Sequence, residues 1–130
     1  MANTLTITVT NLFSDSATVN GSLFNTEGEF PTGEKFKTFS GTPGAGNTEV
    51  QINIADLPDG QYAIALYQDI NGNGKLDQNL LQIPTEPIGF SNNTFPKLRK
   101  PNWAECVLNI SGGSVATSVQ LYKMMGGSHA

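Results

Sequence analysis

The residues best suited to chemistry lie in one short polar segment, residues 69–77, which reads DINGNGKLD. Side chains that carry oxygen occupy its first, third, fifth and ninth positions, and calcium prefers such ligands at about 2.3–2.6 Å. In loops that wrap around calcium, a main-chain carbonyl contributes from the seventh position. The pattern therefore predicts a calcium site with the side chains of Asp69, Asn71, Asn73 and Asp77 and the carbonyl oxygen of Lys75.

Two further positions decide how closely this segment follows the calcium-loop pattern. Gly74 occupies the sixth position, where the chain turns sharply and a residue without Cβ reaches positive φ most readily. The twelfth position is Leu80, whereas the helix-loop-helix pattern has a bidentate Glu there. We expect Glu86 to supply the missing carboxylate, because it is the nearest acid downstream. With only Asp69 and Asp77 charged inside the loop, calcium should bind weakly, with a dissociation constant of about 10⁻⁴–10⁻³ M.

The same residues admit a simpler interpretation as a tight turn. Asn and Gly dominate turns with positive φ, and Asn and Asp side chains bond to their own backbone. We favour the ion site because two acids at the correct offsets exceed what a turn requires. Magnesium fits less well, since it demands near-octahedral geometry and usually keeps several of its waters.

Composition limits the classes of function. The chain has 130 residues, enough for one domain with a real core but short for two. Its formal net charge of −4 argues against binding to nucleic acid and to an anionic membrane surface. No apolar stretch approaches the roughly 18 residues of a membrane span, and the N-terminus lacks a charged-then-apolar signal segment. We therefore expect no nucleic-acid partner and no membrane insertion.

The sequence also lacks most catalytic devices. Its one histidine is His129, near the C-terminus, so neither a Ser-His-Asp nor a Cys-His arrangement has a base. Its one cysteine, Cys106, lies in an apolar run and excludes an internal disulfide and a Cys-cluster metal site. A carboxylate pair of the glycosidase type stays open, although no spacing among the acids favours one. We predict a non-enzymatic protein.

The elements that must position the polar segment are predicted to be β-strands. Apolar and polar residues alternate with a period of two, which is typical of strands with one buried face. The run at residues 62–67 is apolar throughout and, being short and preceded by Pro-Asp-Gly, is expected to be a strand covered on both faces rather than a buried helix. Alternation places further strands at residues 4–10, 18–23, 49–54, 105–110 and 115–122, and a short strand or helical turn is expected near 35–39.

Six to seven strands without a convincing amphipathic helix predict an all-β fold, a single two-sheet antiparallel β-sandwich of the prealbumin or immunoglobulin kind with one long loop. We expect residues 4–10 and 18–23 to pair as a hairpin. The domain should span residues 4–123, with a leader remnant or added start at 1–3 and a flexible tail at 124–130. Asp69 then directly follows a rigid strand, which preorganises the predicted ion site.

The connection from Asn71 to Pro101 is too long for an ordinary loop, and loops of this size are usually functional or held in place. A bound ion is one way to hold it. The alternative is a module that binds a carbohydrate or another ligand through the aromatic residues of this loop. Its candidate residues are Phe90, Asn92, Phe95 and Trp103.

Three stretches carry a resemblance to a known family. ALYQDINGNGKLD at residues 65–77, PTEPIGFSNN at 84–93 and PNWAE at 101–105 resemble the pattern of the bacterial domain-of-unknown-function family 2141, and the resemblance extends from about Leu5 to Tyr122. It implies a small exported β-sandwich protein, similar to transthyretin-like and surface-repeat domains, that is periplasmic, secreted or held at the bacterial cell surface. No established activity comes with it. Such a protein would meet an extracellular protein or a glycan as its partner.

Overall fold

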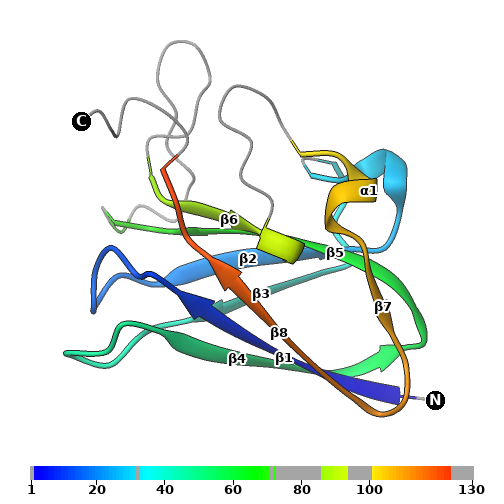
Figure 1. Cartoon of the computed structure of the whole chain (residues 1–130), viewed down its shortest axis with the longest axis horizontal. Helices are drawn as coiled ribbons and strands as arrows, with labels where there is room; N and C mark the ends of the chain where they lie inside the picture. The colour runs from blue at the N-terminus through cyan, green and yellow to red at the C-terminus, as the bar shows by residue number, and fades with distance from the viewer. Residues whose placement is uncertain (1, 32, 71, 73–85, 94–100, 124–130) are drawn as a thin grey trace.

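The fold is a sandwich of two stacked β-sheets (Figure 1). The computed structural model describes residues 2–31, 33–70, 72, 86–93 and 101–123. In these ranges the strands are β1 (Ala2–Thr10), β2 (Val19–Phe24), β3 (Lys37–Gly41), β4 (Val50–Pro58), β5 (Gly60–Gln68), β6 (Ile88–Phe90), β7 (Leu108–Ile110) and β8 (Ser114–Gln120). The helical turns in these ranges are η1 (Glu27–Glu29), η2 (Ser91–Asn93) and α1 (Trp103–Cys106).

The strand order confirms the predicted all-β sandwich and refines it. One sheet has the order β4-β1-β8 and the other the order β3-β2-β5-β6, with β7 also paired to β5. The second sheet is antiparallel throughout. In the first sheet β1 runs antiparallel to β4 but parallel to β8. The sandwich is therefore antiparallel in one layer and mixed in the other.

The predicted hairpin of residues 4–10 with residues 18–23 is wrong. β1 pairs with β4 and β8, whereas β2 pairs with β3 and β5 in the opposite sheet. Residues 11–18 thus carry the chain from one layer to the other. The physical reason is that two strands facing each other across a core bury alternate residues just as two paired strands do, so alternation does not separate the two arrangements.

Two boundaries differ from the prediction, and one open alternative is decided. β1 begins at Ala2, and the buried side chain of Asn3 donates to the carbonyl of Leu57 at 2.8 Å, so the sandwich starts before residue 4. The stretch at 105–110 begins as helix rather than strand, because a capping box between Asn102 and Glu105 starts α1, which Cys106 ends. Near residues 35–39 the strand alternative is correct, as β3. Residues 124–130 lie outside the described ranges.

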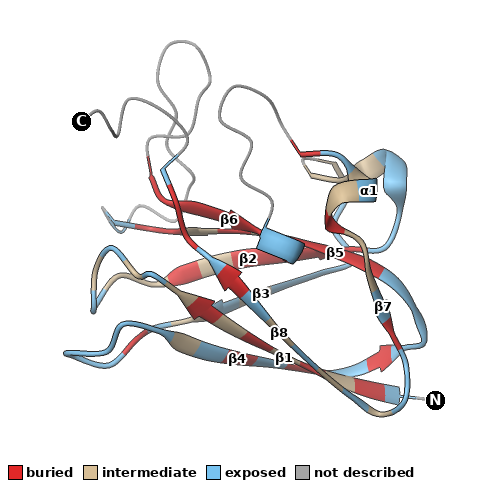
Figure 2. Cartoon of the chain, viewed as in Figure 1, coloured by how far each residue is buried: buried red, intermediate tan, exposed pale blue. Residues whose placement is uncertain are grey.

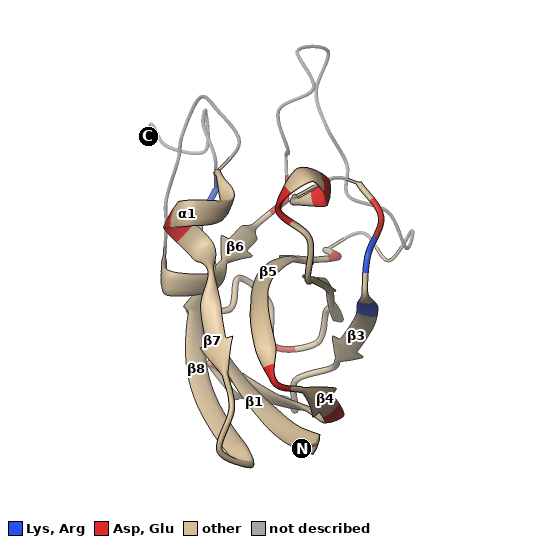
Figure 3. Cartoon of the chain, turned by 90° about the vertical axis from the view of Figure 1, so that its right-hand side faces the viewer, with Lys and Arg blue, Asp and Glu red and all other residues tan. Residues whose placement is uncertain are grey.

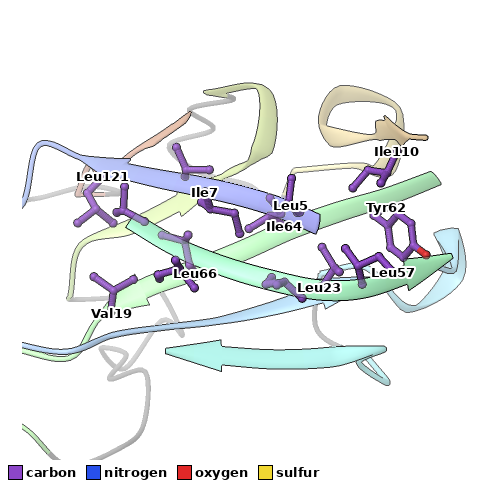
Figure 4. Close-up of a cluster of buried hydrophobic side chains, with 14 residues drawn as sticks. Leu5, Ile7, Val19, Leu23, Leu57, Tyr62, Ile64, Leu66, Ile110 and Leu121 are labelled. Carbon is purple, nitrogen blue, oxygen red and sulfur yellow. The ribbon is translucent and has the colours of Figure 1, made fainter. Parts of the chain in front are cut away.

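The main core lies between the two sheets (Figure 4). Each strand of β1, β2, β4 and β5 contributes alternate apolar residues to it, which appear as the buried stretches of Figure 2. Tyr62, Ile64 and Leu66 of β5 face this core, while Ala63 belongs to a second buried cluster on the other face of the same strand. The expectation that residues 62–67 are covered on both faces is confirmed.

The second cluster connects the other face of β5 with α1, through Cys106. Its buried members are Ala63, Ile88, Phe90, Cys106 and Tyr122. None of the helices in the described ranges has the length and hydrophobicity needed to cross a lipid bilayer.

Candidate functional site

Asp69 leaves β5 at one end of the sandwich, where the chain enters the long connection to β6. Its N–H donates to the carbonyl of Thr18 at 2.8 Å. Its side chain is only 6% exposed, and its Oδ1 atom is shielded from solvent. The carbonyl of Asp69 accepts from the N–H of Gly72 at 3.3 Å, and Gly72 has a φ of 71°, so the chain turns at once after the strand. The first predicted ligand is thus held by a strand end and a turn.

Glu86 returns to this same place from the far side of the connection. Its side chain is 5% exposed, and its Oε2 accepts from the N–H of Ile70 at 2.9 Å. A main-chain hydrogen bond joins the two ends of the connection beside these acids, because the N–H of Gln68 donates to the carbonyl of Pro87 at 2.9 Å. The structure therefore brings the carboxylate of Glu86 to the residue that follows Asp69, which places two buried acids at one strand end.

Gln68 fixes a third segment beside these acids. Its side chain is fully buried. Its Nε2 donates to the carbonyls of Ser14 and Ala17 at 2.8 and 3.1 Å, while its Oε1 accepts from the N–H of Phe13 at 2.9 Å. These three hydrogen bonds of the amide thus hold residues 11–18 against Asp69. Our sequence reasoning missed this residue, although a Gln at an inward position of β5 was a usable signal.

A pocket of about 380 Å³ opens between these segments. Hydroxyl groups, an acid and main-chain atoms line it, from Ser14, Ser16, Ala17, Thr18, Asp69, Ile70 and Gly72. Asp and Glu outnumber Lys and Arg over the described part of the chain as a whole (Figure 3). One cation, Lys123, lies near this end with its Nζ 5.6 Å from the centroid of the Phe13 ring.

The predicted ion ligands divide into two groups. Asp69 and Glu86 are described and lie close together. The other four, Asn71, Asn73, Lys75 and Asp77, lie outside the described residues, as does Gly74. Within the described ranges, no group of three or more His, Cys, Asp or Glu side chains is placed to hold a metal ion.

The aromatic residues proposed for the alternative ligand site serve mainly in packing. Phe90 is 8% exposed, and its ring centroid lies 6.4 Å from that of Phe30 and 6.5 Å from that of Tyr122. Trp103 is half-buried with its ring edge-to-face on Phe30 at 6.3 Å. Phe95 lies outside the described residues. The ring of Phe90 is therefore part of the second buried cluster.

The stretch after Phe90 joins several elements through side-chain hydrogen bonds. Ser91 is fully buried, and its Oγ accepts from the N–H of Ile64 at 3.0 Å and donates to the carbonyl of Cys106 at 2.5 Å. Asn92 donates through Nδ2 to the carbonyl of Val107 at 3.0 Å, and Asn93 accepts through Oδ1 from the N–H of Gln120 at 2.9 Å.

Both asparagines have positive φ, 64° and 52°, which Asn tolerates better than most residues. The side chains of residues 91–93 thus connect β5, α1 and β8. Asn92, a candidate of the alternative ligand site, is one of these structural links.

The family described as "Uncharacterized protein conserved in bacteria (DUF2141)" matches residues 7–118. The chain belongs to this family. No curated protein and no solved structure matches the chain. The DUF2141 match begins within β1 and ends within β8, so it covers nearly the whole sandwich. It confirms the resemblance drawn from residues 65–77, 84–93 and 101–105, and it includes the strand end where Asp69 and Glu86 meet.

Proposed function

We propose that this DUF2141 protein is an exported, non-enzymatic β-sandwich protein whose β5–β6 connection binds calcium as a structural clip. The observation that supports this most is the meeting of Asp69 and Glu86, two buried acids that enter from opposite sides of the connection. A charge taken out of water needs compensation, and a divalent cation supplies it for two carboxylates at once. The ion would close the connection where it leaves and rejoins the sheet.

The residues between these acids suit the same ion. Asn71, Asn73, the carbonyl of Lys75 and Asp77 add oxygen ligands at the spacing of a calcium loop. The described part of the site is rigid, since Asp69 follows β5 directly and Glu86 lies two residues before β6. Ligands on rigid elements lose less entropy when the ion binds. A clip of this kind stabilises the folded state and requires no catalytic group.

Thermal unfolding with calcium and with excess chelator tests the proposal. The parent should gain about 1–3 kcal/mol of stability in ~10 mM calcium, because an ion of the expected affinity that binds only the folded state stabilises it by mass action. Magnesium should stabilise it less. The double variant Asp69→Asn with Asp77→Asn should show no calcium response.

A matched control changes the net charge equally elsewhere. Glu27→Gln with Glu34→Gln removes two exposed carboxylates, and this variant should keep the full calcium response. A parent that melts at the same temperature with calcium and with chelator would show that residues 69–77 form a turn without an ion. An equal loss of response in both double variants would point to general charge screening instead of a site.

A further inference from the structure

The outer side of β8 carries main-chain groups that point away from its sheet. β8 is an edge strand, with β1 as its partner in the order β4-β1-β8 (Figure 1). The N–H of Thr4 donates to the carbonyl of Gly113, and the N–H of Leu121 donates to the carbonyl of Thr10, both at 3.0 Å. The main-chain N–H and carbonyl groups of the odd-numbered residues here therefore point toward β1. Because main-chain groups alternate in direction along a strand, the N–H and carbonyl groups of the even-numbered residues of β8 point away from β1.

Three of these outward residues form what we call the open β8 edge: Ser114, Ala116 and Ser118. All three are exposed. Within the described ranges, the N–H and carbonyl groups of these three residues have no hydrogen-bond partner. The fourth outward residue, Gln120, differs because its N–H donates to Oδ1 of Asn93. The edge is thus open over three alternate residues and closed at Gln120.

The other long edges carry features that discourage pairing. On β4, the pairing register with β1 shifts near Asn3, Asp56 has a φ of 62°, and the strand ends with Pro58. β3 begins with the exposed Lys37. Bulges, prolines and charged residues are the devices by which sheets prevent unwanted pairing. β8 reads SVATSVQ and contains none of them. An edge without such protection is suited to receive a further strand.

We propose that the open β8 edge pairs with the same edge of a second copy of this chain. An antiparallel arrangement with its two-fold axis at Ala116 sets Ala116 of one protomer opposite Ala116 of its partner, and Ser114 opposite Ser118. This register brings all three outward residues of each copy into hydrogen-bonded positions. Such an interface is self-complementary, as two-fold symmetry requires. It joins the two three-stranded sheets into one continuous sheet.

A second copy fits this edge because β8 has no charged residues and the residues of the open β8 edge have small side chains. Two chains of net charge −4 repel each other in general, but no charged residue lies on β8. Like charges therefore do not come face to face across the axis. The outward-facing Ser and Ala side chains are small and leave room for a close approach. The contact is much smaller than the about 1,600 Å² of a standard interface, so the dimer should be weak and dependent on concentration.

Sedimentation equilibrium of the full chain from about 10 μM to about 1 mM tests this pairing. We expect a reversible monomer–dimer equilibrium in the parent. Ala116→Lys places two ammonium groups opposite each other at the axis and should raise the dimer dissociation constant about tenfold or more. The side chain of residue 116 is exposed, so this variant keeps the monomer fold. Ala55→Lys is the matched control, since Ala55 is also an exposed alanine of the same sheet, on β4.

A charge-pairing experiment separates a defined register from general disruption. Ala116→Glu alone should also stay monomeric, whereas an equimolar mixture with Ala116→Lys should form heterodimers, because opposite charges then meet at the axis. A parent that remains monomeric throughout the concentration range overturns the proposal, and so does a dimer that Ala116→Lys leaves intact. Equal weakening by Ala116→Lys and Ala55→Lys would also overturn it, because the contact would then involve the sheet face.

Discussion

Ser91 shows how one buried hydroxyl group joins two distant parts of the chain. Its Oγ serves the N–H of Ile64 in β5 and the carbonyl of Cys106 in α1. Gln68 does the same with an amide at the last residue of β5. Buried polar groups are costly unless they are bonded, so both residues favour this one arrangement of their neighbours over looser ones.

Ser91→Ala should therefore destabilise the protein more than its size suggests. The change leaves the N–H of Ile64 and the carbonyl of Cys106 without the hydroxyl they share, and a buried unsatisfied group costs about 1–3 kcal/mol. Urea unfolding of both proteins measures the difference. Ser40→Ala, at an exposed position of β3, is the control and should change stability by less than about 0.5 kcal/mol. Equal stability of the two variants would contradict the role assigned to Ser91.

Tyr62 should give the protein a pH dependence on the alkaline side. The pKa of Tyr62 is raised above 10.0, first because burial disfavours the phenolate and second because Asp59 is negatively charged. Its hydroxyl donates to the carbonyl of Pro58 at 2.7 Å. With a pKa higher in the folded than in the unfolded state, Tyr62 contributes stability that is present below pH 10.0 and is lost as the pH rises through its folded pKa.

Tyr62→Phe should separate the effect of the hydrogen bond to Pro58 from the effect of ionising the phenol. At neutral pH the variant should be less stable by about 0.5–1.5 kcal/mol, since the carbonyl of Pro58 loses its donor. Above about pH 10 the parent should lose stability more steeply than the variant, because the variant has no phenol to ionise at this position. Urea unfolding at about pH 8 and about pH 11 measures both differences. An equal pH dependence in the two proteins would exclude the titration of Tyr62 as a cause.

Among the elements, β6 approaches β8 most closely through a glycine. A Cβ added at Gly89 would lie 2.6 Å from Cγ1 of Val119 and 3.2 Å from the carbonyl oxygen of Gln120. Ile88 forms a bridge with Tyr122 in the same place. This corner is where the two sheets approach each other beside η2, and its spacing depends on the absence of a side chain.

Gly89→Ala should thus force β6 away from β8. Overpacking of this kind typically costs about 1–3 kcal/mol, here because a backbone oxygen and a core valine must both move. Gly28→Ala is the matched control, since a Cβ at that position meets no atom within 4 Å. Guanidinium unfolding of the two variants checks the expectation. If Gly89→Ala is as stable as the control, the corner is looser than the structure indicates.

For the elements, the sequence predicts where the strands lie better than it predicts which strands pair. Leu5, Ile7 and Val9 alternate with threonines, and burial acts on each residue separately, so the pattern identifies the strand and its inner face. Pairing depends on a second segment that the pattern does not specify, and for β1 one partner is β8, more than a hundred residues away. The helix α1 did have a local signal, because Asn102 and Glu105 have the spacing of a capping box.

The positions of Asp69 and Glu86 were predictable for similar reasons. Asp69 could be placed because a local apolar run ends just before it, and Glu86 because it is the next acid along the chain. Gln68 had a usable signal in its inward position on β5, but its partners in residues 11–18 could not be predicted, since they depend on the loop between the layers folding back on β5.

For the molecule as a whole, the two cores should unfold together. β5 belongs to both, with Ile64 in the main core and Ala63 in the second cluster, and Ser91 connects the two. Fluorescence of Trp103, which packs on the second cluster, should therefore follow the same urea transition as the far-ultraviolet circular dichroism of the sheets. An earlier transition by fluorescence would mean that the α1 region unfolds separately.

The parallel pairing of β1 with β8 also determines how the fold responds to a pulling force. β1 is the first strand and β8 the last among the described residues, and their register aligns Thr4 with Ser114 and Thr10 with Gln120. The start of β1 and the finish of β8 consequently lie at opposite ends of the pair. Tension applied there loads the pair in shear, so its hydrogen bonds share the force and do not open one at a time. The sandwich is built to resist stretching along this axis.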